Sequence, residues 1–262
     1  MINKAMVRML VALAALLVAI AIGGCGESEK IIGLSQLEGK VFAVPAGTVA
    51  DQLVLSEFPD AKFMYYDSAF DACLAVKSSE ADAAAYDEPI LRNIAAKVEG
   101  ITVLPDMITV DAYGFAVQLG QEALKDTIDK VVTRLKDGGT YDEMLDRWLP
   151  EEGAPAAMPD ISLTGDKGVL RFGTAAVTEP FSFVDDGQDV VGFDIELAMY
   201  VARELGMQLE VVNMDFGDMI PALTAGDVDM IGACITITEE RAKSVLFSAP
   251  YYTGGIAALV KE

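Results

Sequence analysis

Short apolar runs alternate with amphipathic segments along most of this chain. In the segment 194–205, Leu197, Val201 and Leu205 recur at four-residue spacing, which would place them on one face of a helix. The short apolar runs between such segments predict strands. A regular alternation of strands and helices predicts an α/β architecture with largely parallel sheets.

The individual elements follow from this alternation. We expect strands at 40–44, 62–66, 81–85, 101–104, 113–117, 169–174 and 208–213. We expect helices at 47–58, 68–77, 88–96, 122–136, 140–148, 194–205 and 220–225. The stretch from Pro150 to Lys167 has no periodicity and contains Pro155 and Pro159, which predicts a linker over 151–167.

The first residues are typical of an export signal. Lys4 and Arg8 precede an apolar run over 9–22, which is short for a membrane span. The run ends at Ile22-Gly23-Gly24-Cys25, which resembles the cleavage site of bacterial lipoproteins. We therefore expect a signal peptide over 1–24, a lipid on Cys25 and a folded part held outside the cytoplasm at a membrane surface. An uncleaved anchor helix is the alternative.

Composition excludes several classes of function. The net charge of −22 argues against a nucleic-acid partner, because such partners require clustered positive charge. The chain contains no histidine, which excludes Ser-His and Cys-His nucleophiles and histidine metal sites. We expect no cofactor and no metal.

Two parts of the chain resemble the two halves of one known family. Residues 168–262 contain Pro180-Phe181-Ser182-Phe183, the segment 235–241 (ITITEER) and the segment 247–252 (FSAPYY). These motifs resemble the opening half of the bacterial extracellular solute-binding proteins of family 3, the amino-acid-binding proteins of ABC importers. Residues 36–150 resemble the second half of the same family, through QLEGKVFAVPAGTVADQL, ADAAAYDEPIL and the segment 113–149.

The resemblance implies a two-lobed periplasmic-binding-protein type II fold with a hinge, in which the order of the lobes is circularly permuted. The expected divisions are a tether over 25–35, a smaller lobe over 36–110, a hinge strand and C-terminal helices of the larger lobe over 111–150, the larger lobe over 168–254, and a second hinge strand over 255–262. The linker would join the original termini of the family, and the new termini at about Gly33 and Glu262 would lie beside a crossover strand.

Alternatives to a permuted monomer remain open. The chain could be a truncated tandem gene, or it could form a domain-swapped dimer with the same contacts between chains. A permuted chain would keep one covalent crossover, near Val110–Tyr113, so a loose hinge is expected. Cys73 and Cys234 would lie in different lobes, and a disulfide between them would lock any cleft. We therefore expect two free, buried thiols.

The resemblance also implies how a ligand carboxylate is bound. The family arginine at the position of Arg241 grips the carboxylate, and Thr236 adds a hydroxyl group. A guanidinium can make two parallel hydrogen bonds to a carboxylate. The alternative is a surface arginine paired with Glu239 or Glu240.

Residues of the smaller lobe complete the expected contacts. Gly47 and Thr48 stand between a strand and a helix, where free N–H groups favour an anion, although Thr48 could simply cap the helix. The resemblance implies that Asp87 binds the ligand ammonium, and a helix cap is the alternative. Phe216, Phe181, Cys234 and Tyr86 match pocket positions of the family, and Cys234 replaces a small residue there.

The expected function is the capture of a small amino acid by closure of the lobes, with delivery to an ABC permease. The absence of a spare cation near the side-chain pocket favours a neutral ligand, although Glu179 could reach a basic one. Rival functions are a cyclohexadienyl-dehydratase-like enzyme, with Glu179 or Glu88 as general acid, a ligand-sensing module, and a relative that binds nothing. We expect a binding protein and not an enzyme.

Overall fold

The computed structural model describes residues 30–150 and 155–262. The expected signal peptide over 1–24, the lipid acceptor Cys25 and the first part of the tether, 25–29, lie outside the described residues. Residues Ile32–Glu262 form one unit, and the description that follows concerns this unit. Within the described part, no helix has the length and apolar character that crossing a membrane requires.

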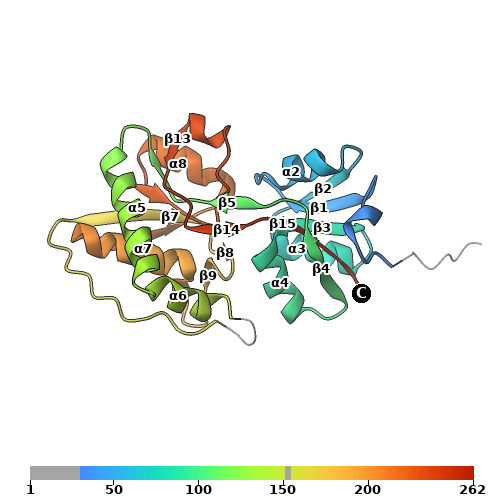
Figure 1. Cartoon of the computed structure of the whole chain (residues 1–262), viewed down its shortest axis with the longest axis horizontal. Helices are drawn as coiled ribbons and strands as arrows, with labels where there is room; N and C mark the ends of the chain where they lie inside the picture. The colour runs from blue at the N-terminus through green and yellow to red at the C-terminus, as the bar shows by residue number, and fades with distance from the viewer. Residues whose placement is uncertain (1–29, 151–154) are drawn as a thin grey trace, which may run out of the picture. The chain divides into compact units, whose positions relative to one another are not determined.

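The smaller lobe is built on a five-stranded sheet with the strand order β2-β1-β3-β15-β4 (Figure 1). Its strands are β1 (Val41–Pro45), β2 (Lys62–Tyr66), β3 (Ala83–Asp87), β4 (Ile101–Met107) and β15 (Ile256–Lys261). Its helices are η1 (Leu34–Gln36), α2 (Ala50–Glu57), α3 (Ala69–Lys77) and α4 (Glu88–Lys97). β1 is parallel to β2 and β3, whereas β15 is antiparallel to both of its neighbours.

The larger lobe is built on a second five-stranded sheet, with the order β11-β7-β12-β6-β13. Its strands are β6 (Ala116–Gln118), β7 (Val169–Thr174), β11 (Gln208–Asn213), β12 (Met230–Ile231) and β13 (Val245–Phe247). Its helices are α5 (Glu122–Asp137), α6 (Thr140–Trp148), α7 (Phe193–Leu205), η2 (Phe216–Asp218), α8 (Met219–Ala225) and η3 (Arg241–Lys243). A small sheet contains β8 (Val177–Thr178), β9 (Ser182–Val184) and β10 (Val190–Val191).

A two-stranded ribbon connects the two sheets. It consists of β5 (Asp111–Tyr113) and β14 (Tyr252–Gly254), which are antiparallel. The chain leaves β5 to form β6, an interior strand next to the edge of the larger-lobe sheet, and it leaves β14 to form β15, an interior strand next to the edge of the smaller-lobe sheet (Figure 1). Each sheet therefore receives one antiparallel strand from the chain that has just crossed the ribbon.

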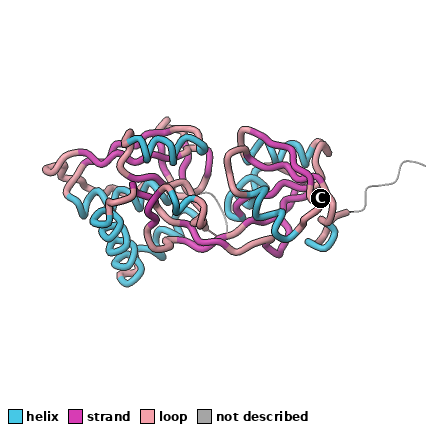
Figure 2. Tube along the Cα trace, turned by 90° about the horizontal axis from the view of Figure 1, so that it is seen from above, coloured by secondary structure: helices cyan, strands magenta, loops and turns pink. Residues whose placement is uncertain are grey.

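Local chemistry accounts for the helix ends. The hydroxyl oxygen of Ser68 accepts a hydrogen bond from the backbone N–H of Asp71 and so caps α3. Pro89 lies in the first turn of α4, where its missing N–H costs nothing. α7 ends at Gly206, whose φ of 72° is the left-handed conformation that glycine adopts without strain. Helices cover both large sheets (Figure 2).

The α/β fold class and its two-lobed arrangement are confirmed, and each expected helix is present. The expected strand at 113–117 is two strands, β5 and β6, because the chain passes from the ribbon into the larger-lobe sheet at Gly114. Residues 155–165 contain no helix or strand. Cys73 and Cys234 are free and buried, as expected.

The prediction of a second hinge strand over 255–262 is wrong. The crossing strand is β14, and β15 lies between β3 and β4. The reason is the apolar run from Ile256 to Val260, which is buried throughout and requires a position covered on both faces of a sheet. Both crossings are continuous in the chain, so the premise of a loosened hinge is also wrong. Glu262 lies at the far end of β15 from the ribbon and not beside a crossover (Figure 1).

Candidate ligand-binding site

The candidate residues gather where parallel strands of both sheets end. β1 and β3 end just before Gly47 and at Asp87, and β12 ends shortly before Cys234. The carboxyl ends of strands are the usual place for ligands in open α/β sheets. Seven of the nine expected residues line one small cavity: Thr48, Tyr86, Asp87, Phe216, Cys234, Thr236 and Arg241.

This cavity is small. Its volume is about 10 Å³, which is room for about one water molecule. A neighbouring cavity of about 70 Å³ is lined by Gly47 and shares Phe216 and Arg241 with the first. Typical small-molecule sites have volumes of roughly 300–1,000 Å³. A ligand of amino-acid size therefore requires the walls of this site to move apart.

Arg241 is held against the cavity wall by its own segment. Its backbone N–H donates to the Thr238 hydroxyl oxygen at 3.2 Å, and its Nη1 donates to the Thr236 carbonyl oxygen at 3.0 Å. The guanidinium lies over the ring of Phe216, 5.5 Å from the ring centre, a favourable cation–π distance. Burial lowers the pKa of Arg241, while Tyr86, Asp87 and Cys234 act to raise it. Arg241 therefore lies in the cavity wall, and the alternative of a surface arginine paired with Glu239 or Glu240 is wrong.

Asp87 supplies a buried carboxyl group on the other side of the same cavity. Its Oδ1 accepts a hydrogen bond from the hydroxyl of Tyr113, and the thiol of Cys234 lies 3.9 Å from its Oδ2. Burial raises the pKa of Asp87 to about 7, whereas the Tyr113 hydrogen bond and the charge of Arg241 act to lower it. The site therefore places an acid and a guanidinium on one cavity, as amine and carboxylate recognition requires.

Thr48 has a local role in addition to its place in the cavity wall. Its hydroxyl donates to the Pro45 carbonyl oxygen at 2.9 Å and accepts from the Ala50 N–H at 3.3 Å. Gly47 has a φ of 74°, so the turn that leads into α2 depends on a glycine. Val49 and Ala50 also line the cavity, so the start of α2 faces the site.

Phe181 does not line either cavity, which corrects the expectation that it flanks the ligand. Its side chain is fully buried and packs against the rings of Tyr113, Phe193 and Tyr252. It contributes to the site only by supporting Tyr113. The contact between Tyr113 and Asp87 was not predicted, because these residues are distant in the chain and come together only at the ribbon.

The acids proposed for an enzyme are engaged elsewhere. Glu179 forms an ion pair with Lys97 at 2.5 Å, and Glu88 pairs with Arg92. Neither carboxylate lines the two small cavities. Among the described residues that line these cavities, Asp87 is the acidic one.

Cys234 has an unusual backbone conformation. Its φ of 45° lies in the left-handed region, which is strained for a residue with a side chain. Its N–H donates to Asp194 Oδ2 at 2.9 Å, which holds the backbone in place.

We expect Cys234→Gly to change the free energy of unfolding by less than about 1 kcal/mol, because relief of strain offsets the lost burial of the thiol. The same substitution at Cys73, inside α3, is expected to cost about 2 kcal/mol or more. Urea unfolding measures both. Equal losses at the two sites would show that Cys234 is not strained.

Two buried carboxyl groups predict an unusual pH dependence of stability. Burial raises the pKa of Asp194 to about 7, as it does for Asp87, from the ordinary value of 3.8. Between about pH 4 and 7 the folded protein then binds more protons than the unfolded chain, so stability falls as pH rises through this window. From pH 5 to pH 8 each carboxyl group is expected to remove about 2–3 kcal/mol.

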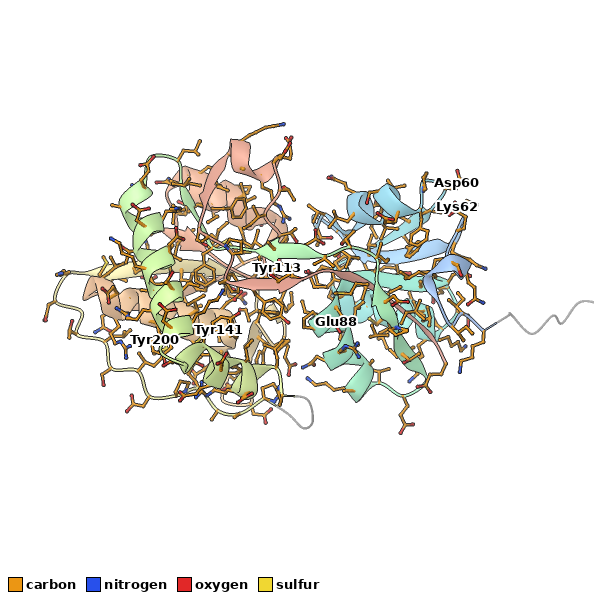
Figure 3. The ribbon with its side chains drawn as sticks, viewed as in Figure 1. Asp60, Lys62, Glu88, Tyr113, Tyr141 and Tyr200 are labelled. Carbon is orange, nitrogen blue, oxygen red and sulfur yellow. The ribbon has the colours of Figure 1, made fainter. Side chains whose placement is uncertain are left out.

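Asp194→Asn tests this expectation, because the amide oxygen can still accept the Cys234 N–H. The drop in unfolding free energy between pH 5 and pH 8, measured by denaturant titration, should shrink by about 2–3 kcal/mol. The exposed Asp60, labelled in Figure 3, provides the control Asp60→Asn, which should leave the drop unchanged. An equal drop in Asp194→Asn and the parent protein would contradict the prediction.

The cavity is lined by a guanidinium from one lobe and a carboxyl group from the other, which carry the charges opposite to those of a carboxylate and an ammonium group. Comparison with known sequences agrees. Residues 170–262 match the family model of bacterial extracellular solute-binding proteins, family 3. The match agrees with the resemblance found over residues 168–262 of the sequence. The matched range includes Phe216, Cys234, Thr236 and Arg241, but not the smaller-lobe residues Gly47, Thr48, Tyr86 and Asp87.

Similar curated proteins bind different amino acids. The arginine-binding extracellular protein ArtP of Bacillus subtilis is 44% identical over 96 residues, which is 37% of each chain. The L-cystine-binding protein TcyJ of Escherichia coli is 34% identical over 97 residues, covering 37% of this chain and 36% of TcyJ. The glutamine-binding protein GlnH of Bacillus subtilis is 31% identical over 115 residues, covering 44% of this chain and 42% of GlnH.

The chain thus spans well under half the length of these relatives. A solved structure of an ancestral arginine-binding protein bound to arginine is 50% identical over 33% of this chain and 38% of its own, with a TM-score of 0.32. The curated relatives are named as binding proteins, in agreement with the expectation that this chain is not an enzyme.

Proposed function

We propose that this protein binds a small amino acid between its two lobes and delivers it to an ABC permease outside the cytoplasm. The observation that carries the proposal is that Arg241 and Asp87 line one cavity. A guanidinium matches the ligand carboxylate, and an ionised Asp87 matches the ammonium. Neither group alone distinguishes an amino acid from other anions or amines.

Binding requires an opening movement. The cavity is far smaller than an amino acid, and its walls come from both lobes, which the β5–β14 ribbon connects. A ligand that contacts both walls would favour the closed arrangement over the open one. Scattering with and without ligand should therefore show compaction on binding.

The charges around the site favour a neutral side chain on the ligand. A basic ligand would need a second carboxylate beside Asp87, and Glu179 is paired with Lys97. The relatives named above bind arginine, cystine and glutamine, so their names alone do not decide which amino acid this protein binds. We propose a neutral polar or modestly apolar amino acid.

Membrane attachment and permutation belong to the same proposal. A lipid on Cys25 would hold the protein at the membrane surface that carries the permease. Segments 116–148 and 169–247 build the larger lobe. The resemblance places the counterpart of 169–247 before that of 116–148, whereas in this chain 169–247 comes second. A circular permutation with both lobes in one chain would account for this order.

A thermal-shift screen of the purified protein against the twenty amino acids tests the proposal. A ligand at 100 times its dissociation constant should add about 2.7 kcal/mol to the free energy of unfolding. Calorimetry on the best ligand then gives its affinity. If none of the twenty raises the melting temperature, the protein does not bind a free amino acid.

A further inference from the structure

Tyr113 stands where the two lobes meet. It is the last residue of β5, its side chain is fully buried, and it lies at the ribbon in Figure 3. Its ring stacks on Tyr252 of the opposite ribbon strand, with ring centres 5.7 Å apart, and meets Phe181 edge-on at 5.9 Å. These contacts fix the ring in one orientation.

The main chain around Tyr113 is attached to the ligand motif of the larger lobe. Tyr113 forms an antiparallel β-bridge with Thr236, and the Ile237 N–H donates to the Ala112 carbonyl oxygen at 2.9 Å. The Tyr251 N–H donates to the carbonyl oxygen of Tyr113 at 3.0 Å. The backbone of Tyr113 therefore follows the segment that carries Thr236 and Arg241.

The side chain of Tyr113 reaches the other lobe. Its hydroxyl donates to Oδ1 of Asp87, at the end of β3. Glycine at position 254 permits this path, because a Cβ there would lie 2.6 Å from the Tyr113 hydroxyl oxygen. One residue thus connects the carboxylate-binding segment of the larger lobe to the ammonium-binding carboxyl group of the smaller lobe.

The groups around Asp87 show why this bond matters. The titratable groups that influence or contact its carboxyl group are Tyr113, Arg241, Asp111 and Cys234. Tyr86, the preceding residue, also lines the cavity. The Tyr113 hydroxyl donates directly to this carboxyl group, whereas the Cys234 thiol is a weak donor at 3.9 Å.

We propose that Tyr113 is a positioning residue, whose hydroxyl orients the carboxyl group of Asp87 by a hydrogen bond, so that amine recognition by the smaller lobe depends on the crossover ribbon. The proposal rests on the proposed function, since it gives Asp87 the ligand ammonium. It assigns to the ribbon a part in ligand recognition in addition to its part in connecting the lobes.

The electrostatics have a definite sign. Burial raises the pKa of Asp87 and the Tyr113 hydrogen bond lowers it, and the resulting pKa is about 7. Removal of the hydroxyl leaves burial unopposed by this bond, so the pKa rises further and Asp87 is protonated at neutral pH. A protonated Asp87 offers no charge to an ammonium group.

The first experiment requires no ligand. The protein is labelled with aspartate carrying ¹³C at Cγ, and the Asp87 signal is assigned as the one missing in Asp87→Asn. In Tyr113→Phe the pKa of Asp87 should rise by about one unit or more. Tyr252→Phe removes a hydroxyl from the neighbouring ring and should leave it unchanged. An unchanged pKa in Tyr113→Phe overturns the proposal.

A second substitution keeps the test decisive if Tyr113→Phe does not fold. Replacement of Tyr113 by 3-fluorotyrosine retains the ring and makes the hydroxyl a stronger donor. The pKa of Asp87 should then fall below that of the parent protein. A rise, or no change, would contradict a direct hydrogen bond.

The second experiment measures ligand affinity as a function of pH, with L-glutamine and L-arginine as probes in calorimetry from pH 6 to 8.5. Tyr113→Phe should bind about fivefold more weakly than the parent at pH 7, with the difference shrinking toward pH 8.5. Tyr252→Phe should match the parent at each pH. A loss that is equal at every pH would indicate a merely structural role. If neither probe binds the parent protein, the proposed function is in question, while the carboxyl titration still decides the role of Tyr113.

Discussion

Arg241→Ala is expected to weaken amino-acid binding by about 3 kcal/mol, which is more than 100-fold. The guanidinium is already oriented by the Thr236 carbonyl oxygen and the ring of Phe216, so it meets a carboxylate at little entropic cost. Alanine removes both the charge and the fork of donors, and the ligand carboxylate would be buried without a partner. Calorimetry with the best ligand of the thermal-shift screen measures the loss.

Two further variants sharpen this experiment. Lys243→Ala removes a cation from the same short helix, but Lys243 is exposed and pairs with Glu240, so its loss should leave affinity unchanged within about twofold. Arg241→Lys retains the charge without the fork and should fall between the parent and Arg241→Ala. Undiminished binding by Arg241→Ala would remove Arg241 from the site.

Glu196→Ala is expected to destabilise the protein by about 3–5 kcal/mol. The carboxylate of Glu196 is fully buried in α7 and accepts hydrogen bonds from Arg147 Nη1 at 2.8 Å and from Trp148 Nε1 at 2.6 Å. Alanine would leave the guanidinium and the indole N–H without their acceptor. Since Arg147 and Trp148 are in α6, this contact fastens the segment before the linker to the segment after it.

Glu204→Ala is the matched control in the same helix. Glu204 pairs with Arg134 at 2.5 Å, but both side chains are largely exposed, so its loss should cost less than about 1 kcal/mol. Urea unfolding of the two variants gives the comparison. A loss of less than 1 kcal/mol in Glu196→Ala would show that α6 does not depend on this carboxylate.

The helices and longer strands could be predicted from the sequence because their apolar spacing is regular. The two-residue strands β8, β10 and β12 could not, because no period can be established over so short a length. Their pairing depends on partners that are distant in the chain. The same reason explains why the place of β15 was predicted wrongly. Its apolar run fits a hinge strand or an interior strand of a sheet equally well until its neighbours are known.

The candidate site was predictable to the extent that motifs mark single residues. Arg241, Thr236 and Asp87 stand in recognisable segments, and the structure brings them to one cavity. Phe181 was misplaced because an aromatic side chain fits a core or a ligand pocket with the same sequence signature. Tyr113 was missed as a partner of Asp87, because a hydrogen bond between residues 26 positions apart leaves no trace in local sequence.

The exchange of interior strands through the ribbon has a consequence for assembly. A cut in the stretch 151–154 would give one piece with β1 to β4 and the interior strand β6 of the opposite sheet, and a second piece with β7, β11, β12, β13 and the interior strand β15 of the first piece's sheet. Neither fragment could complete its own core, because the gap in each sheet is filled by the other. The two fragments should therefore stay unfolded when alone and recover structure only when mixed, and the intact chain should unfold in a single cooperative step.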